Sequence, residues 1–157
     1  MGVLMDLIAG DAREILLALS VDDWDGLRDR GWFVATLSLG AEMEPEWLDL
    51  FALAARETSG GPLPGSFTDA RRGIRTRGAT LSDRTVERVD RDWVASVAAL
   101  AANHFDRIAT RWLELLASES WISNSDDSPP LHEVVERLTS FCRAASVAED
   151  VLLAWDI

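Results

Sequence analysis

The pattern of apolar and polar positions is clearest near the C-terminal end of the chain. From residue 131 to residue 145 the apolar side chains recur at offsets of three and four, which predicts a helix with one buried stripe. After Glu149 and Asp150 the spacing changes to a continuous apolar run, residues 151–155, which is typical of a buried strand. We therefore expect a helix that leads directly into a core strand, with the earlier elements packed around this pair.

The first half of the chain contains two further strand patterns, each followed by helical patterns. Residues 3–9 predict a strand, and Asp11 then begins a helix as its cap, with Ala12, Ile15, Leu16 and Leu19 on the buried face. Residues 22–30 predict a short helix, and residues 32–39, rich in β-branched and aromatic side chains, predict a second strand.

The second half begins with a segment that is rich in glycine and proline. Residues 58–84 predict a long loop with at most one turn of helix. Residues 85–89 then predict a strand, and Asp90 caps a helix. Asn103 restarts the helical pattern, with Asp106 at the third helical position after it. The whole pattern predicts one α+β domain, residues 1–157, in which a mixed or antiparallel sheet of about four strands packs against five to six helices.

The helix expected at residues 45–56 has more apolar residues than one buried face requires. They are Trp47, Leu48, Leu50, Phe51, Leu53 and Ala54. Such a helix is either central to the core or offers a second apolar face to a partner. The second possibility predicts a homodimer through residues 45–56.

Composition limits the functions that the chain can have. The net charge of −12 argues against general nucleic-acid binding, and no apolar run reaches the length of a membrane span. The single cysteine and the absence of a recognisable export signal predict a cytoplasmic protein. All basic residues are arginine, and the lack of lysine excludes Schiff-base chemistry and a phosphate-loop lysine.

Residues 68–91 are basic, although the rest of the chain is acidic. This segment holds seven arginines and four acidic residues, and we call it the arginine segment. Because arginine binds phosphate and carboxylate groups with two parallel hydrogen bonds, Arg71, Arg72, Arg75 and Arg77 are the candidate ligand-binding residues. The simpler alternative is that they balance the acidic residues of their own chain.

Other groupings of reactive residues give no catalytic or metal site. Cys142 and His132 would lie about 15 Å apart on one helix, so they cannot act as a nucleophile and its base. His104, Asp106 and His132 could in principle bind a metal, but Asp106 is better explained by capping a helix. We therefore predict no metal and no cofactor.

Three segments carry a resemblance to a known family. They are MGVLMDLIA at residues 1–9, VERVDRDWVASVAAL at 86–100 and LTSFCRAASVAEDVLLAW at 138–155. Together they resemble the YfbM-like family, a group of bacterial domains of unknown function. The resemblance implies an α+β fold over nearly the whole chain and brings no activity and no catalytic residues.

The sequence therefore favours a non-enzymatic binding or interaction domain whose partner is unknown. One alternative is an enzyme or small-molecule binder with a cleft of carboxylates, such as Glu87, Asp90 or Asp92, and nearby arginines. The other is an immunity-type protein that uses its acidic charge to bind a basic partner.

Overall fold

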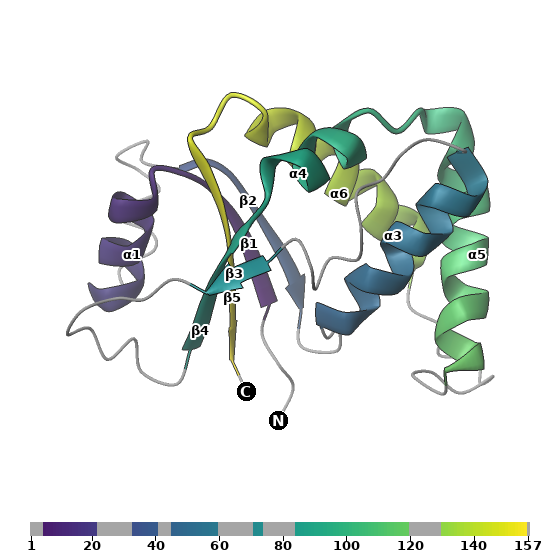
Figure 1. Ribbon diagram of the computed structural model, residues 1–157, viewed down its shortest axis with the longest axis horizontal. Coiled ribbons are helices and arrows are strands. Elements are labelled where there is room, and N and C mark those ends of the chain that lie inside the picture. The colour runs from purple at the N-terminus through teal and green to yellow at the C-terminus, as the bar shows by residue number, and fades with distance from the viewer. Residues whose placement is uncertain are drawn as a thin grey trace.

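The computed structural model describes residues 5–21, 33–40, 45–59, 71–73, 84–119 and 130–156. It confirms the α+β fold: an antiparallel sheet packs against helices on both faces (Figure 1). The strands are β1 (Met5–Gly10), β2 (Phe33–Gly40), β3 (Arg71–Gly73), β4 (Arg84–Val89) and β5 (Asp150–Asp156). The helices are α1 (Ala12–Val21), α3 (Pro45–Ser59), α4 (Arg91–Ala98), α5 (Phe105–Ser118) and α6 (Leu131–Ala145), with a 3-10 turn η1 (Ala102–His104).

The C-terminal strand β5 occupies the centre of the sheet. The strand order is β2-β1-β5-β4-β3, so β5 pairs with β1 on one side and with β4 on the other. Its residues Val151 to Ala154 are all buried. Helix α6 ends only five residues before β5 begins, which confirms that a helix leads almost directly into the core strand.

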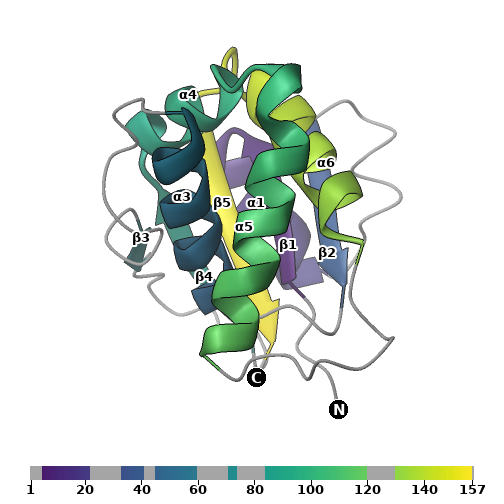
Figure 2. The same ribbon diagram turned by 90° about the vertical axis from the view of Figure 1, so that its right-hand side faces the viewer.

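The two faces of the sheet are covered very unequally. Helices α3, α4, α5 and α6 lie on one face, and α1 lies on the other (Figures 1 and 2). Alternate β5 residues divide accordingly, since Leu153 belongs to the large core under the four helices and Leu152 belongs to the small core under α1. This alternation is the expected result of a strand that is buried on both faces.

Helix α3 is central to the large core. Phe51 is fully buried, with its ring centroid 5.2 Å from that of Trp112 and 6.3 Å from that of Trp93. The indole N–H of Trp112 donates to the backbone carbonyl of Trp47 at 2.8 Å, which ties α5 to α3. The chain's own core thus explains the surplus of apolar residues on α3. The homodimer through residues 45–56 stays a prediction, but this surplus no longer supports it.

The structure differs from the expected elements in three places. Strand β3 lies inside the segment 58–84 that the sequence predicts to be a loop, and it is the fifth strand of a sheet expected to have about four. Helix α3 continues to Ser59, and α5 begins at Phe105 after η1, so Asn103 does not cap it. The predicted helix at residues 22–30 lies outside the described residues.

Within the described part of the chain, none of the helices has the length and apolar character that a membrane crossing requires.

Candidate functional site

The arginine segment lies at one edge of the sheet. Arg71 and Arg72 belong to β3, the edge strand beside β4 (Figure 1). The antiparallel register places Arg72 opposite Arg88 of β4. Arg84 is the first residue of β4. Of the four predicted ligand-binding arginines, the structure therefore brings Arg71 and Arg72 to a sheet edge, whereas Arg75 and Arg77 lie outside the described residues.

Arg88 is paired with a carboxylate from the central strand. Its Nε lies 3.5 Å from Oδ1 of Asp150, and about half of the Arg88 side chain is exposed. The other carboxylate oxygen of Asp150 accepts a hydrogen bond from the backbone N–H of Ala12 at 3.2 Å. Asp150 thus joins the basic edge to the N-terminal end of α1, where negative charge is favourable.

A second carboxylate caps the same end of α1. Oδ1 of Asp11 accepts from the backbone N–H groups of Arg13 and Glu14, at 2.9 and 3.2 Å, which confirms the predicted cap. The N–H of Glu14 is the main reason that the pKa of Asp11 lies below its ordinary value, because the hydrogen bond favours the charged carboxylate.

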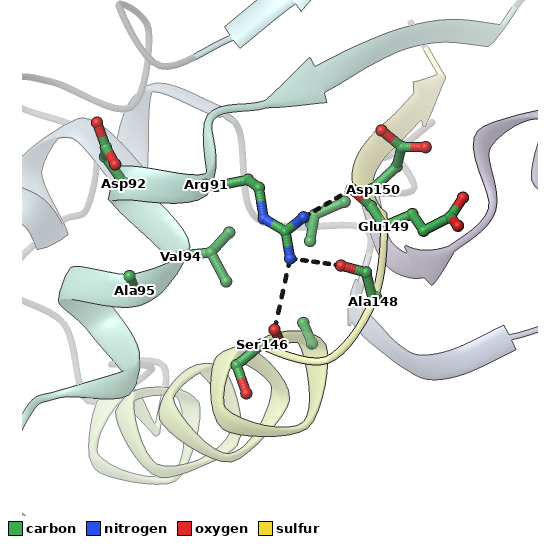
Figure 3. A pocket seen from close by; sticks show the side chains of 10 residues that line it. Arg91, Asp92, Val94, Ala95, Ser146, Ala148, Glu149 and Asp150 are labelled. Atoms are coloured by element: carbon green, nitrogen blue, oxygen red, sulfur yellow. Dashed lines mark hydrogen bonds between the residues drawn. The ribbon is translucent and has the colours of Figure 1, made fainter.

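Arg91 lies at the start of α4 and projects into a pocket of about 170 Å³ between α4, the end of α6 and the start of β5 (Figure 3). Its guanidinium donates to the carbonyl of Ala148 at 2.6 Å, to that of Glu149 at 3.2 Å and to that of Ser146 at 3.4 Å. These carbonyls belong to the turn that connects α6 to β5. Arg91 therefore fixes the turn from which the central strand begins.

Arg143 makes the reciprocal connection from α6. Its guanidinium donates to the carbonyl of Leu100 at 2.8 Å and to that of Ala98 at 3.1 Å, at the C-terminal end of α4. Two arginines thus bind carbonyl groups at the ends of each other's helices, where the helix dipole favours positive charge. The sequence pattern does not indicate a role for Arg143, because its partners are backbone atoms more than forty residues away.

The pocket at Arg91 gives little support to the predicted enzyme cleft, in which carboxylates would act as acid or base beside arginines. Asp92, Glu149 and Asp150 line it, but Glu87 and Asp90 are not among its lining residues. Asp90 is the residue that precedes α4, as predicted, yet its side chain makes no capping hydrogen bond. The guanidinium in the pocket is already bound to three carbonyls, so the arrangement is explained as a structural clamp.

One of the two histidines connects α5 to α6. Nδ1 of His132 lies 2.7 Å from Oδ1 of Asp106, and its Nε2 lies 3.1 Å from Oε1 of Glu136. The carboxylates sit on opposite ring nitrogens, so they do not converge on one point as metal ligands would. Among the described residues, no group of three or more His, Cys, Asp or Glu side chains could hold a metal ion.

Cys142 is part of the large core. Its side chain is fully buried, and burial raises the pKa of the thiol from 9.0 to about 12. Because the thiolate is the nucleophile, a thiol in this position is inert near neutral pH. The structure therefore places Cys142 among the packed residues of the large core.

Comparisons of the chain with protein-family models, with curated proteins and with solved structures gave no match. The resemblance to the YfbM-like family stays a prediction, and the function must be argued from the residues themselves.

Proposed function

We propose that this chain is a non-enzymatic binding domain, and that the arginines of β3 and β4 hold an acidic partner at the edge of the sheet. We call this surface, Arg71 and Arg72 of β3 with Arg88 of β4, the arginine edge. The observation that supports the proposal most strongly is the register of Arg72 with Arg88 on the outermost pair of strands.

Two like charges directly opposite each other on neighbouring strands destabilise a sheet. The nearby carboxylate of Asp150 offsets part of this repulsion, but it also accepts a hydrogen bond from the start of α1. A carboxylate supplied by a partner would add a counter-charge at the position where the register sets two arginines opposite each other. Arginine suits this role, because its planar group binds a carboxylate through two parallel hydrogen bonds.

The position at a sheet edge favours an extended acidic segment as the partner. Among the described residues, no strand pairs with the outer side of β3. A peptide in extended conformation can add its main chain to such an edge while its side chains meet the residues of the edge strand. The acidic remainder of the chain, which repels an acidic partner elsewhere, would direct it to the arginine edge.

The test is the binding of fluorescently labelled poly-L-glutamate to two double variants of equal net charge. Arg71→Gln with Arg72→Gln removes both arginines of β3, and Arg107→Gln with Arg137→Gln removes two exposed arginines from α5 and α6. We expect the wild type and the α5/α6 variant to bind the polymer at low salt and to release it at high salt. We expect the β3 variant to bind at least tenfold more weakly at low salt. Equal binding by the two variants, or no binding by the wild type, would contradict the proposal.

The alternatives from the sequence remain predictions with less support. An enzyme would need reactive groups free to meet a substrate, whereas the guanidinium of Arg91 is occupied by backbone carbonyls. An immunity-type role rests on the net charge of −12 and on no particular surface. We also propose that the protein is bacterial and located in the cytoplasm. Its single cysteine, which is buried, fits a reducing compartment.

A further inference from the structure

The opposite edge of the sheet has a different chemical character. Strand β2 has eight residues, FVATLSLG, and it is the one strand of the five described that contains no charged residue. It also contains no proline. Edge strands of soluble proteins usually avoid pairing with other chains through charged residues, proline or very short length. The other edge, β3, is both short and charged, so only β2 lacks this protection.

The exposed groups of β2 suit pairing with another strand. Thr36 and Ser38 are exposed, and Val34 is 47% exposed, whereas Leu37 is buried in the large core. Among the described residues, no strand pairs with the outer side of β2, which is the right-hand strand of the sheet in Figure 2. The pairing with β1 is regular from Ala35 to Ser38 and irregular at both ends, so these four residues form the straight part of the edge.

The charge of the chain indicates which partner this edge accepts. A second copy also carries a net charge of −12, so two copies repel each other unless they meet at a neutral surface. Strand β2 provides such a surface, and a symmetric dimer needs one patch that is complementary to itself. A charged partner, in contrast, finds no ion-pairing group on this strand.

An antiparallel pair of identical strands continues the sheet only when directly opposite residues lie on the same face. This condition places one residue of β2 on the two-fold axis, opposite its own copy. With Thr36 on the axis, Ala35 lies opposite Leu37 of the second copy. Threonine pairs are favourable on neighbouring strands, and the small Ala35 leaves room beside the larger Leu37.

We propose that β2 pairs with β2 of a second copy about an axis at Thr36, forming a dimer with one continuous sheet. This inference does not depend on the proposed acidic partner, because it concerns the opposite edge. Since both copies are acidic, added salt should strengthen the dimer. An assembly held by ion pairs would respond to salt in the opposite way.

Light scattering on charge variants tests the contact and its register together. Thr36→Lys and Thr36→Glu each place like charges on the axis, so each variant alone should have the mass of one chain. An equimolar mixture of the two should regain the mass of two chains, because lysine then faces glutamate. The matched control is Thr110→Lys on the exposed side of α5, which should remain a dimer.

Disulfide formation provides a second test that does not rely on charge. Directly opposite residues have α-carbons about 4.5–5.5 Å apart, within the range of a disulfide, so Thr36→Cys should form a covalent dimer on oxidation. Val34→Cys should not form a covalent dimer, because residue 34 of the second copy lies four positions further along the strand, roughly 13 Å away. The native thiol does not interfere, since Cys142 is buried. A wild type with the mass of one chain at millimolar concentration and high salt, or equal cross-linking of both cysteine variants, would overturn the proposal.

Discussion

Arg91 and Arg143 show how much of this fold depends on side chains that bind backbone carbonyls. Each arginine connects the region of one helix terminus to a segment about fifty residues away. Neither contact can be read from the sequence, because every residue offers the same carbonyl group and the distance along the chain is large. The sequence correctly identified the arginine segment as unusual, but it could not separate Arg91, which fixes a turn, from Arg72, which lies at an edge.

Capping residues were easier to predict, because their partners are close in the chain. Asp11 accepts from the N–H groups of residues 13 and 14, as the sequence indicated. The prediction failed at Asp90, whose side chain makes no capping hydrogen bond, and at Asn103, where a 3-10 turn precedes α5 and moves its start to Phe105. Such a turn leaves no distinct sequence pattern.

Cys142 supports a prediction about stability in alkaline solution. Its pKa is 9.0 ordinarily and about 12 in the folded chain, so between these values the unfolded state loses a proton that the folded state keeps. The free energy of unfolding is therefore unaffected by this thiol below pH 9 and should fall above it, by at most about 1.4 kcal/mol per pH unit. The chain contains no lysine and no tyrosine, so no other side chain has its ordinary pKa in this window.

The measurement is urea unfolding of the wild type and of Cys142→Ala at several pH values from 8 to 11. We expect Cys142→Ala to be less stable at pH 8, because it leaves a small cavity, and to lose the slope above pH 9. Parallel curves for the two proteins would show that the thiol does not control alkaline stability.

At the scale of elements, α3 connects α4 and α5 within the large core through the ring of Phe51. Replacing Phe51 with alanine removes the ring that contacts both Trp93 and Trp112, and it should lower the free energy of unfolding by about 3–5 kcal/mol. Leu53→Ala on the same helix is the control, since Leu53 is 39% exposed, and its cost should be about 1 kcal/mol or less. Chemical denaturation of both variants provides the comparison, and similar losses would contradict a central position for α3.

The sequence predicted long periodic elements well and short ones poorly. The stripe of α6 was found because fifteen residues are enough to display a period, and β5 was found because its apolar residues follow one another without interruption. Strand β3 was missed because its three residues, Arg71 to Gly73, display none. Its position depends on pairing with β4, a contact between segments that the pattern of each alone does not reveal. Arg71 and Arg72 were therefore predicted to lie in a loop, whereas they belong to a strand.

At the scale of the whole molecule, charge and sheet edges are related. One edge combines arginines with a short strand, and the other combines a longer strand with no charge. The first suits an acidic partner and the second suits a neutral one. The central claim is that the arginine edge serves a partner, and the alternative is that its arginines balance the acidic body of their own chain.

Thermal unfolding at low and high ionic strength tests this claim most directly. Arg71, Arg72, Arg75 and Arg77 are replaced together by glutamine, and the control replaces Arg13, Arg56, Arg107 and Arg137, so that both variants have a net charge of −16. If the arginine edge serves a partner, the chain does not need these arginines as counter-charges, so the quadruple variant should melt within about 2 °C of the control at both ionic strengths. A melting temperature well below that of the control at low salt, restored by added salt, would contradict the claim and identify these arginines as counter-charges of the chain itself.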